Sequence, residues 1–279
     1  MILGCVQGLT EFVPVSSTAH LYLAQSILGI RNDEMALSFD VLLHLGTALA
    51  LIVATRRELI AMIQETARWI RGRPAADPAA RAMLIPLVVG TVPGVLAGLL
   101  LLRRFEEMRT LLVIGITMLI ACGYFFFAEG IADRRRGRER DLVDLRLQDG
   151  LWIGVAQAAA GLLAGLSRSG LTIATGKLRR LNRPDAARFS FLLALPIILG
   201  AGAKALLDLR KVAEPTMSGS VLLVGFVASA VVGYLAIEFM LKFVRTHSLR
   251  PFGIYLAALG LVLILTAVFP GLVPFSAPR

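Results

Sequence analysis

Side chains that could do chemistry gather near the N-terminus, inside otherwise apolar sequence. Gln7 and Glu11 lie four residues apart, so they share one face of a helix. Pro14 ends that helix. The hydroxyl and imidazole groups that follow are those of Ser16, Ser17, Thr18 and His20. A carboxylate and a histidine in apolar sequence are costly unless they are paired or hydrated, which makes this cluster a candidate site. The alternative is a capping turn in which one of the two serines is the N-cap residue.

A second polar cluster places a guanidinium at the start of a helix that runs toward Lys177. Arg168 stands within a short run of serines and glycines, which consists of Gly165, Ser167, Ser169 and Gly170. The glycines let the backbone turn tightly. Amides at a helix N-terminus, together with a guanidinium that can bind two oxygens, form a strong phosphate site. We therefore expect this run to bind phosphate with the help of Ser16 and Thr18. The alternative is an arginine that extends to the membrane interface.

Together the two clusters hold the groups that phosphoryl transfer requires. The Ser17 hydroxyl can attack phosphorus only if a base takes its proton, and His20 is the candidate base. Arg168 would meet the charge that develops on the phosphate oxygens. Glu11 would either orient His20 or, with Gln7, hold a divalent cation, for which oxygen ligands are suitable. The residues leave both roles of Glu11 open.

Asp40 and His44 form a second polar pair with helical spacing, in the next apolar segment. Two roles are open for them. They either line the cavity and brace the first cluster or take part in the chemistry directly. The spacing favours the supporting role.

The chain that must position these groups has the composition of a membrane protein, because 57% of its 279 residues are hydrophobic and 17% are charged. Segments long enough to cross a hydrocarbon core of about 30 Å are 39–54, 83–102, 111–128, 189–207, 221–241 and 252–269. Two further apolar segments, 1–30 and 151–181, are each interrupted by one of the polar clusters. The net charge of +10 comes from Lys and Arg residues in short loops, which favours a topogenic role over nucleic-acid binding.

The two halves of the chain resemble each other. An offset of 150 aligns Gly4, Gln7, Ser17 and Phe39 with Gly154, Gln157, Ser167 and Phe189. An offset of 135 aligns Gly90 with Gly225. We divide the chain into a first repeat (1–128), a linker (129–149) and a second repeat (150–279) that together form one membrane domain. Each repeat has one broken segment and three spans, so the second repeat is inserted upside down relative to the first.

Charge predicts the orientation of this inverted repeat. The segments 55–80, 129–149, 177–188 and 242–250 are basic and fall on one side, which is cytoplasmic by the positive-inside rule. This agreement requires the segment 151–181 to enter and leave from the same face, as a re-entrant helix hairpin. The first broken segment is then expected to dip from the outer face and the second from the inner face. Their polar tips then meet near the midplane, where irregular backbone needs protein or a hydrated cavity around it. The sequence therefore predicts an all-α membrane protein with six transmembrane helices, two re-entrant hairpins and a site between the hairpin tips.

Five stretches of the chain resemble the undecaprenyl-diphosphate phosphatases, also called bacitracin-resistance proteins, over nearly the full length. These are QGLTEFVPVSSTAHL from Gln7, SFDVLLHLGTALA from Ser38, GLSRSGLTI from Gly165, ARFSFLLALPIILGA from Ala187 and HSLRPFGIY from His247. The resemblance implies a metal-dependent enzyme of the bacterial cytoplasmic membrane, using Mg²⁺ or Ca²⁺. It implies removal of the terminal phosphate of undecaprenyl diphosphate at the external face, which recycles the lipid carrier of cell-wall precursors. By motif position, the family's functional residues correspond to Glu11, Ser17, His20 and Arg168.

Two further questions stay open at this point. A flippase or transporter for polyprenyl phosphate is the alternative function, because inverted repeats with broken helices are typical of secondary transporters. The oligomeric state is also open. The spacing of Gly90, Gly94 and Gly98 permits close helix contact, which favours packing within the chain over dimerisation while allowing an oligomer.

Overall fold

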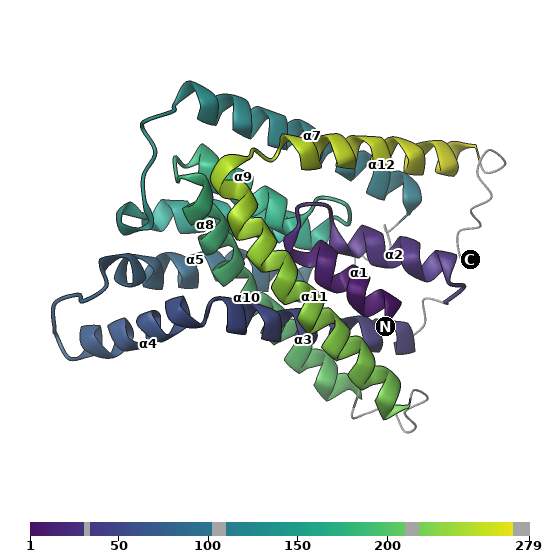
Figure 1. Cartoon of the computed structure of the whole chain (residues 1–279), viewed down its shortest axis with the longest axis horizontal. Helices are drawn as coiled ribbons and strands as arrows, with labels where there is room; N and C mark the ends of the chain where they lie inside the picture. Colours follow the sequence, from purple (N-terminus) through teal and green to yellow (C-terminus); the bar gives the residue numbers. More distant parts are fainter. Residues whose placement is uncertain (31–33, 102–109, 210–217, 270–279) are drawn as a thin grey trace.

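The computed structural model describes residues 1–30, 34–101, 110–209 and 218–269, and this part of the chain is helical (Figure 1). The helices of the first half are α1 (Ile2–Phe12), α2 (Ser17–Ile27), α3 (Glu34–Ala54), α4 (Arg56–Ile70), α5 (Pro78–Leu100) and α7 (Leu111–Arg134). After a short 3₁₀ helix (Leu142–Asp144), the second half has α8 (Leu147–Leu162), α9 (Arg168–Leu178), α10 (Arg183–Leu209), α11 (Gly219–Thr246) and α12 (Arg250–Val268).

Five of the described helices are long and apolar enough to cross a membrane, namely α5, α7, α10, α11 and α12. Helices α3 and α4 pass the same test only as a pair bent by 72°, which makes a sixth candidate span. The predicted all-α membrane architecture is thus confirmed. The two interrupted segments form the helix pairs α1–α2 and α8–α9, and their re-entrant insertion stays a prediction.

Helix α4 is an element that the sequence analysis did not assign, because it considered only the charge of segment 55–80. The helix is strongly amphipathic, with Ile60 and Ile63 exposed and Glu65 buried. Glu65 accepts hydrogen bonds from the amides of Ala76 and Asp77, at 2.9 and 3.1 Å, and from Arg81 at 3.0 Å. The carboxylate thus fastens α4 to the start of α5. An amphipathic helix of this kind is suited to the membrane interface.

Both hairpins turn through a serine with positive φ, namely Ser16 (φ 72°) and Ser167 (φ 50°). This region is costly for a residue with a side chain, so the surrounding structure must hold it. Helices α1 and α8 end 150 residues apart, at Phe12 and Leu162, whereas α2 and α9 begin 151 residues apart. The second turn is therefore one residue longer. The ungapped alignment of Ser17 with Ser167 is wrong at this point, because Ser16 is the structural counterpart of Ser167 and Ser17 that of Arg168.

Each hairpin packs against a helix of the other half through glycines. A Cβ added to Gly4 on α1 would lie 2.5 Å from the carbonyl oxygen of Gly225 on α11, and one added to Gly154 on α8 would overlap the backbone of Gly90 on α5. The two contacts are related by the offsets 150 and 135, which supports the predicted duplication. Gly94 also faces inward, against Ile197. Gly90 and Gly94 of α5 thus serve packing within the chain, whereas a Cβ added to Gly98 would meet no described atom within 4 Å.

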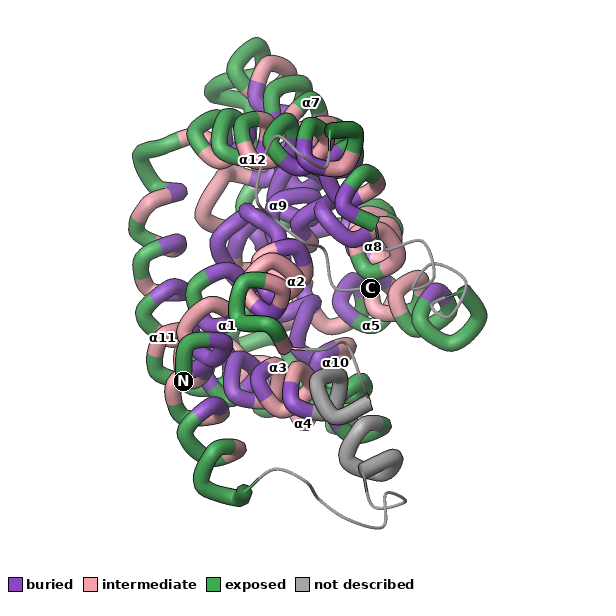
Figure 2. Tube along the Cα trace, turned by 90° about the vertical axis from the view of Figure 1, so that its right-hand side faces the viewer, coloured by how far each residue is buried: buried purple, intermediate pink, exposed green. Residues whose placement is uncertain are grey.

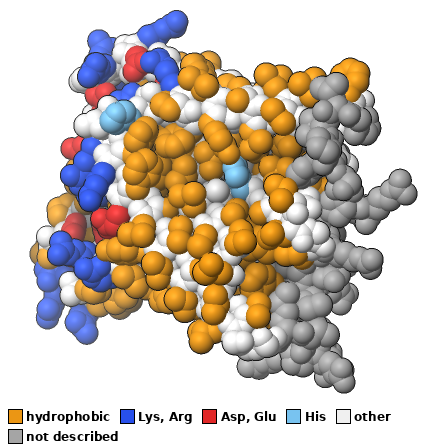
Figure 3. Space-filling view, turned by 45° about the vertical axis from the view of Figure 1, so that its right-hand side comes forward, with side chains coloured by type: hydrophobic (Ala, Val, Ile, Leu, Met, Phe, Trp, Pro, Cys, Tyr) orange, Lys and Arg blue, Asp and Glu red, His pale blue; other side chains and the backbone are white. Residues whose placement is uncertain are grey.

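Helix α9 lies in the middle of the molecule, and its residues from Ser169 to Lys177 are all buried (Figure 2). Arginine and lysine side chains gather at one end of the bundle, while apolar side chains cover its middle (Figure 3). The loops after α4 and α7 lie at that end, on the left of Figure 1, and the N-terminus lies at the other end. The described structure therefore has one basic end, as the charge pattern requires.

The close contact of α8 with α5 predicts an effect on stability. Gly154→Ala should lower the free energy of unfolding in detergent by about 1–3 kcal/mol, because the added methyl group forces two packed backbones apart. The matched control is Gly161→Ala on the same helix, where an added Cβ meets nothing within 4 Å. Thermal unfolding of both variants measures the difference, and equal stability would contradict the close contact.

Candidate active site

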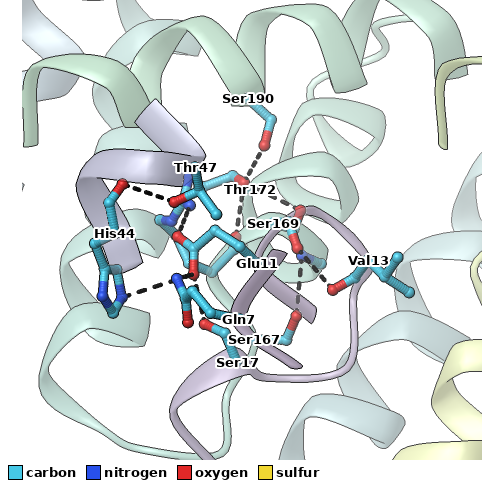
Figure 4. A network of polar contacts seen from close by, with 12 residues as sticks. Gln7, Glu11, Val13, Ser17, His44, Thr47, Ser167, Ser169, Thr172 and Ser190 are labelled. Carbon is cyan, nitrogen blue, oxygen red and sulfur yellow. Dashed lines mark hydrogen bonds and ion pairs between the residues drawn. The ribbon is translucent and has the colours of Figure 1, made fainter. Parts of the chain in front are cut away.

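The Glu11 carboxylate is the centre of the polar contacts between the two hairpins (Figure 4). It is only 6% exposed on α1. Its Oε2 accepts hydrogen bonds from Gln7 Nε2 at 2.9 Å and from Ser17 Oγ at 2.6 Å. Its Oε1 lies 2.5 Å from Nη2 of Arg168 on α9. One carboxylate thus joins the candidate nucleophile of the first half to the guanidinium of the second.

Arg168 is oriented into the protein and does not extend to the membrane interface. Its side chain is 15% exposed. While Nη2 pairs with Glu11, the other terminal nitrogen, Nη1, is buried and has no hydrogen-bond partner in the described part of the chain. A guanidinium can bind two oxygens through its parallel N–H groups. The free Nη1 is therefore a donor for an oxygen of a bound anion.

The two hairpin tips touch each other directly. Ser169 Oγ donates to the carbonyl oxygen of Val13 at 3.3 Å. We expected both glycines of the second cluster to form its tight turn. Gly165 does so, with φ of 100°. Gly170 does not, because it is a helical residue of α9, where the absence of a side chain lets Phe125 and Pro14 approach.

The start of helix α2 offers further hydrogen-bond donors to the site. Ser16 is the N-cap residue, but its side chain makes no capping bond, unlike Ser167, which accepts from the Gly170 amide at 3.4 Å. The capping-turn alternative for the first cluster therefore does not account for the Ser16 hydroxyl. The half-buried Thr18 hydroxyl has no partner among the described residues. Together with the amides of the first turn, it can serve an anion.

His20 is held by partners other than Ser17. Its Nδ1 lies 2.8 Å from the carbonyl oxygen of Ser16, and its Nε2 lies 2.6 Å from the hydroxyl of Tyr255 on α12. Because a carbonyl oxygen can only accept, Nδ1 donates and Nε2 accepts from Tyr255. Ser17 instead donates to Glu11, so the predicted pairing of Ser17 with His20 is not what the structure contains. Tyr255 was missed as a functional residue, although it ends one of the matching stretches.

Asp40 and His44 lie on α3 at the edge of this cluster. His44 Nε2 is 3.8 Å from Glu11 Oε2, and its Nδ1 lies 2.7 Å from the Asp40 carbonyl oxygen. The Asp40 carboxylate accepts a 2.8 Å hydrogen bond from Gln25 Nε2 and thereby ties α3 to α2. The pair borders the carboxylate and braces the first hairpin.

Buried hydroxyl groups fix α9 from its other side and were not singled out from the sequence. Thr172 lies 2.5 Å from Ser190 on α10 and donates to the Arg168 carbonyl oxygen at 2.7 Å. Both residues stand in stretches that resemble the phosphatases, and this is the only signal that could have identified them. Their contacts set the position of the first turn of α9, which carries Arg168.

The site has few ligands for a metal ion. The described residues contain no group of three or more His, Cys, Asp and Glu side chains that could hold one. The Glu11 carboxylate and the Gln7 carbonyl oxygen Oε1, which is buried without a partner among the described residues, are nevertheless hard oxygen donors. This donor set fits a divalent cation that takes its other ligands from substrate oxygens and water.

Comparison with known proteins identifies the family of this chain. The family model described as bacitracin resistance protein BacA matches residues 1–262. A protein of Rubrobacter xylanophilus named undecaprenyl-diphosphatase is 43% identical over 262 residues, covering 93% of this chain and 94% of its own. A protein of the same name from Desulforudis audaxviator is 40% identical, with 97% and 98% covered, and undecaprenyl-diphosphatase 3 of Bacillus cereus is 37% identical, with 95% of each covered. The chain therefore belongs to the BacA family of bacitracin resistance proteins.

Proposed function

We propose that this chain is a phosphatase that hydrolyses undecaprenyl diphosphate to undecaprenyl phosphate and inorganic phosphate. The observation that carries the proposal is the Glu11 carboxylate, which binds the Ser17 hydroxyl and the Arg168 guanidinium at the same time. A nucleophile, a proton acceptor and a phosphate-binding cation are thereby within a few ångströms of each other. The names of the similar proteins support the substrate.

The contacts suggest an order of events. Ser17 Oγ attacks the terminal phosphorus, and its proton passes to Glu11 Oε2. The bond from that phosphorus to the bridging oxygen breaks, undecaprenyl phosphate leaves, and a phosphoserine forms. Water then attacks the phosphoserine, which releases inorganic phosphate and restores the hydroxyl. Arg168 Nη1 and the amides at the start of α2 meet the negative charge on the phosphate oxygens.

His20 has a different role in this proposal from the base suggested by the sequence. Its Nε2 is occupied by Tyr255 and its Nδ1 by the carbonyl oxygen of Ser16, whose backbone has positive φ. The imidazole therefore stabilises the turn that presents Ser17. The hydrogen bond from Ser17 to Glu11 favours the Glu11 carboxylate as the acceptor of the Ser17 proton.

A divalent cation, Mg²⁺ or Ca²⁺, completes the proposed site. Glu11 and the carbonyl oxygen of Gln7 would hold it together with oxygens of the diphosphate. When bound, it supplies positive charge to those oxygens. The protein itself contributes the Gln7 carbonyl oxygen, which lies near the Glu11 carboxylate and has no hydrogen-bond partner among the described residues.

The proposed location is the bacterial cytoplasmic membrane, with the site opening to the external face. The basic end of the bundle would face the cytoplasm by the positive-inside rule. The first hairpin would then enter from the opposite face and bring Ser17 within reach of substrate on that side. Removing the terminal phosphate in this way would recycle the lipid carrier of cell-wall synthesis and contribute to the bacitracin resistance for which the family is named.

Loss of the nucleophile should remove the activity. Ser17→Ala should lower phosphate release from undecaprenyl diphosphate in detergent at least about 100-fold, since no other hydroxyl donates to Glu11 in the described structure. Ser26→Ala is the matched control, because Ser26 lies on the same helix and, among the described residues, its hydroxyl donates only to the carbonyl oxygen of Tyr22. A fully active Ser17→Ala protein would overturn the assignment.

The proton acceptor can be identified by comparing Glu11→Gln with His20→Gln. We expect the Glu11 variant to lose more than about 100-fold in kcat, because it removes the acceptor of the Ser17 proton and the partner of Arg168. The His20 variant should lose much less, since glutamine can still bond to Ser16 or Tyr255. Measuring kcat for both variants identifies the proton acceptor. A larger loss of kcat in His20→Gln than in Glu11→Gln would make His20 the base.

The role of Gln7 can be tested through the metal requirement. Gln7→Leu should raise the Mg²⁺ concentration that gives half-maximal phosphate release about tenfold or more, because it removes a neutral oxygen ligand beside Glu11. Gln157→Leu is the control, since Gln157 is also a buried glutamine but lies on α8, and neither of its amide atoms has a hydrogen-bond partner among the described residues. An unchanged Mg²⁺ titration for Gln7→Leu would exclude Gln7 as a ligand.

A further inference from the structure

A polar cavity lies at the basic end of the bundle, between the ends of α7, α9 and α11 and the start of α10. Its volume is about 200 Å³. Of its thirteen lining residues seven are cationic and two are acidic. The cationic residues are Arg135, Arg136, Arg138, Lys177, Arg180, Arg183 and Arg245, and the acidic ones are Asp133 and Glu139. No residue of the proposed phosphatase site lines this cavity.

Two of the cationic residues that line this basic cavity, Lys177 and Arg183, form ion pairs with Glu129 behind them. The Glu129 side chain is fully buried and pairs with Lys177, which is itself only 4% exposed. It also pairs with Arg183 Nη2 at 2.8 Å and accepts a hydrogen bond from the Leu249 amide at 2.8 Å. Arg183 Nε is buried without a partner in the described part of the chain. A positively charged donor beside the cavity therefore lacks an acceptor.

The mouth of the cavity has unpaired positive charge. Arg136, Arg138 and Arg245 are exposed, and none of their guanidinium groups has a partner among the described residues. The first residues of α10 also line the cavity, so the positive end of that helix dipole lies at its edge. Charges needed only for membrane topology would have no reason to surround a cavity or to leave a buried donor without an acceptor.

The chemistry of this wall fits a phosphate group, since arginines bind phosphate oxygens through paired N–H donors. The cavity lies between helix ends at the basic end of the bundle, where lipid headgroups are found, and basic pockets between helices on the cytoplasmic side are suited to anionic headgroups. Its volume is below the roughly 300 Å³ at which pockets for drug-sized ligands begin. We propose that this cavity binds the phosphate headgroup of an anionic phospholipid, at a site separate from the phosphatase site.

The proposal can be tested by counting bound lipid. The full-length protein in detergent is titrated with phosphatidylglycerol and, separately, with phosphatidylcholine, and native mass spectrometry records the lipid that stays bound. We expect phosphatidylglycerol to be retained in preference to phosphatidylcholine. The triple variant R136Q/R138Q/R245Q should bind phosphatidylglycerol at least about tenfold more weakly.

The matched control is R57Q/R71Q/R73Q, which removes the same charge from exposed positions around α4 that do not line the cavity. It should retain phosphatidylglycerol like the unaltered chain. Thermal unfolding and phosphate release should be unchanged in both variants, which separates this test from that of the phosphatase. Equal losses of phosphatidylglycerol binding in the two triple variants would show only a general attraction between charges and would overturn the proposal. So would a lack of preference for phosphatidylglycerol, or its displacement by millimolar inorganic phosphate, which would make free phosphate the ligand.

Discussion

The buried ion pair between Glu11 and Arg168 is the interaction on which the rest of the site depends. Taking both charges out of water costs several kcal/mol for each, and the pair offsets this only where its geometry is held closely. The hairpin turns, the glycine contacts with α5 and α11 and the bond from Ser169 to Val13 all serve that geometry. Because Arg168 Nη1 still lacks a partner in the described part of the chain, the pair is incomplete by itself. An anion that supplies oxygens at this point satisfies a donor that the protein leaves free.

The extra residue in the second turn explains why related hairpins supply different groups. It places Arg168 at the position that Ser17 has in the first hairpin, so the first residues of α2 and α9 both contact Glu11, one at each oxygen. The second half has no matching carboxylate, since Gly161 stands 150 residues after Glu11. Gln157, which stands 150 residues after Gln7, is buried with both amide atoms unpartnered in the described structure. Two similar hairpins therefore form one site between them.

Much of this arrangement could be predicted from the sequence, and the limits have physical causes. Hydropathy identified the apolar helices, and helical spacing paired Gln7 with Glu11, because both depend on neighbours in the chain. The partner of His20 is Tyr255, 235 residues away, and no local pattern predicts such a contact. Helix α4 was missed because a charge count ignores periodicity. The tight turn assigned to Gly170 was wrong because its small size serves contact with Phe125.

Helix α9 shows how the two halves are held together. It carries a cation at each end, Arg168 with 15% of its side chain exposed and the buried Lys177, which are nine residues and therefore about 14 Å apart. Each cation is neutralised by a carboxylate on a helix of the first half, Glu11 on α1 and Glu129 on α7. Removing one partner of a buried pair leaves an uncompensated charge, which costs more than removing both. The pairs that assemble the phosphatase site and the wall of the basic cavity are therefore also the contacts that fix α9 in the core.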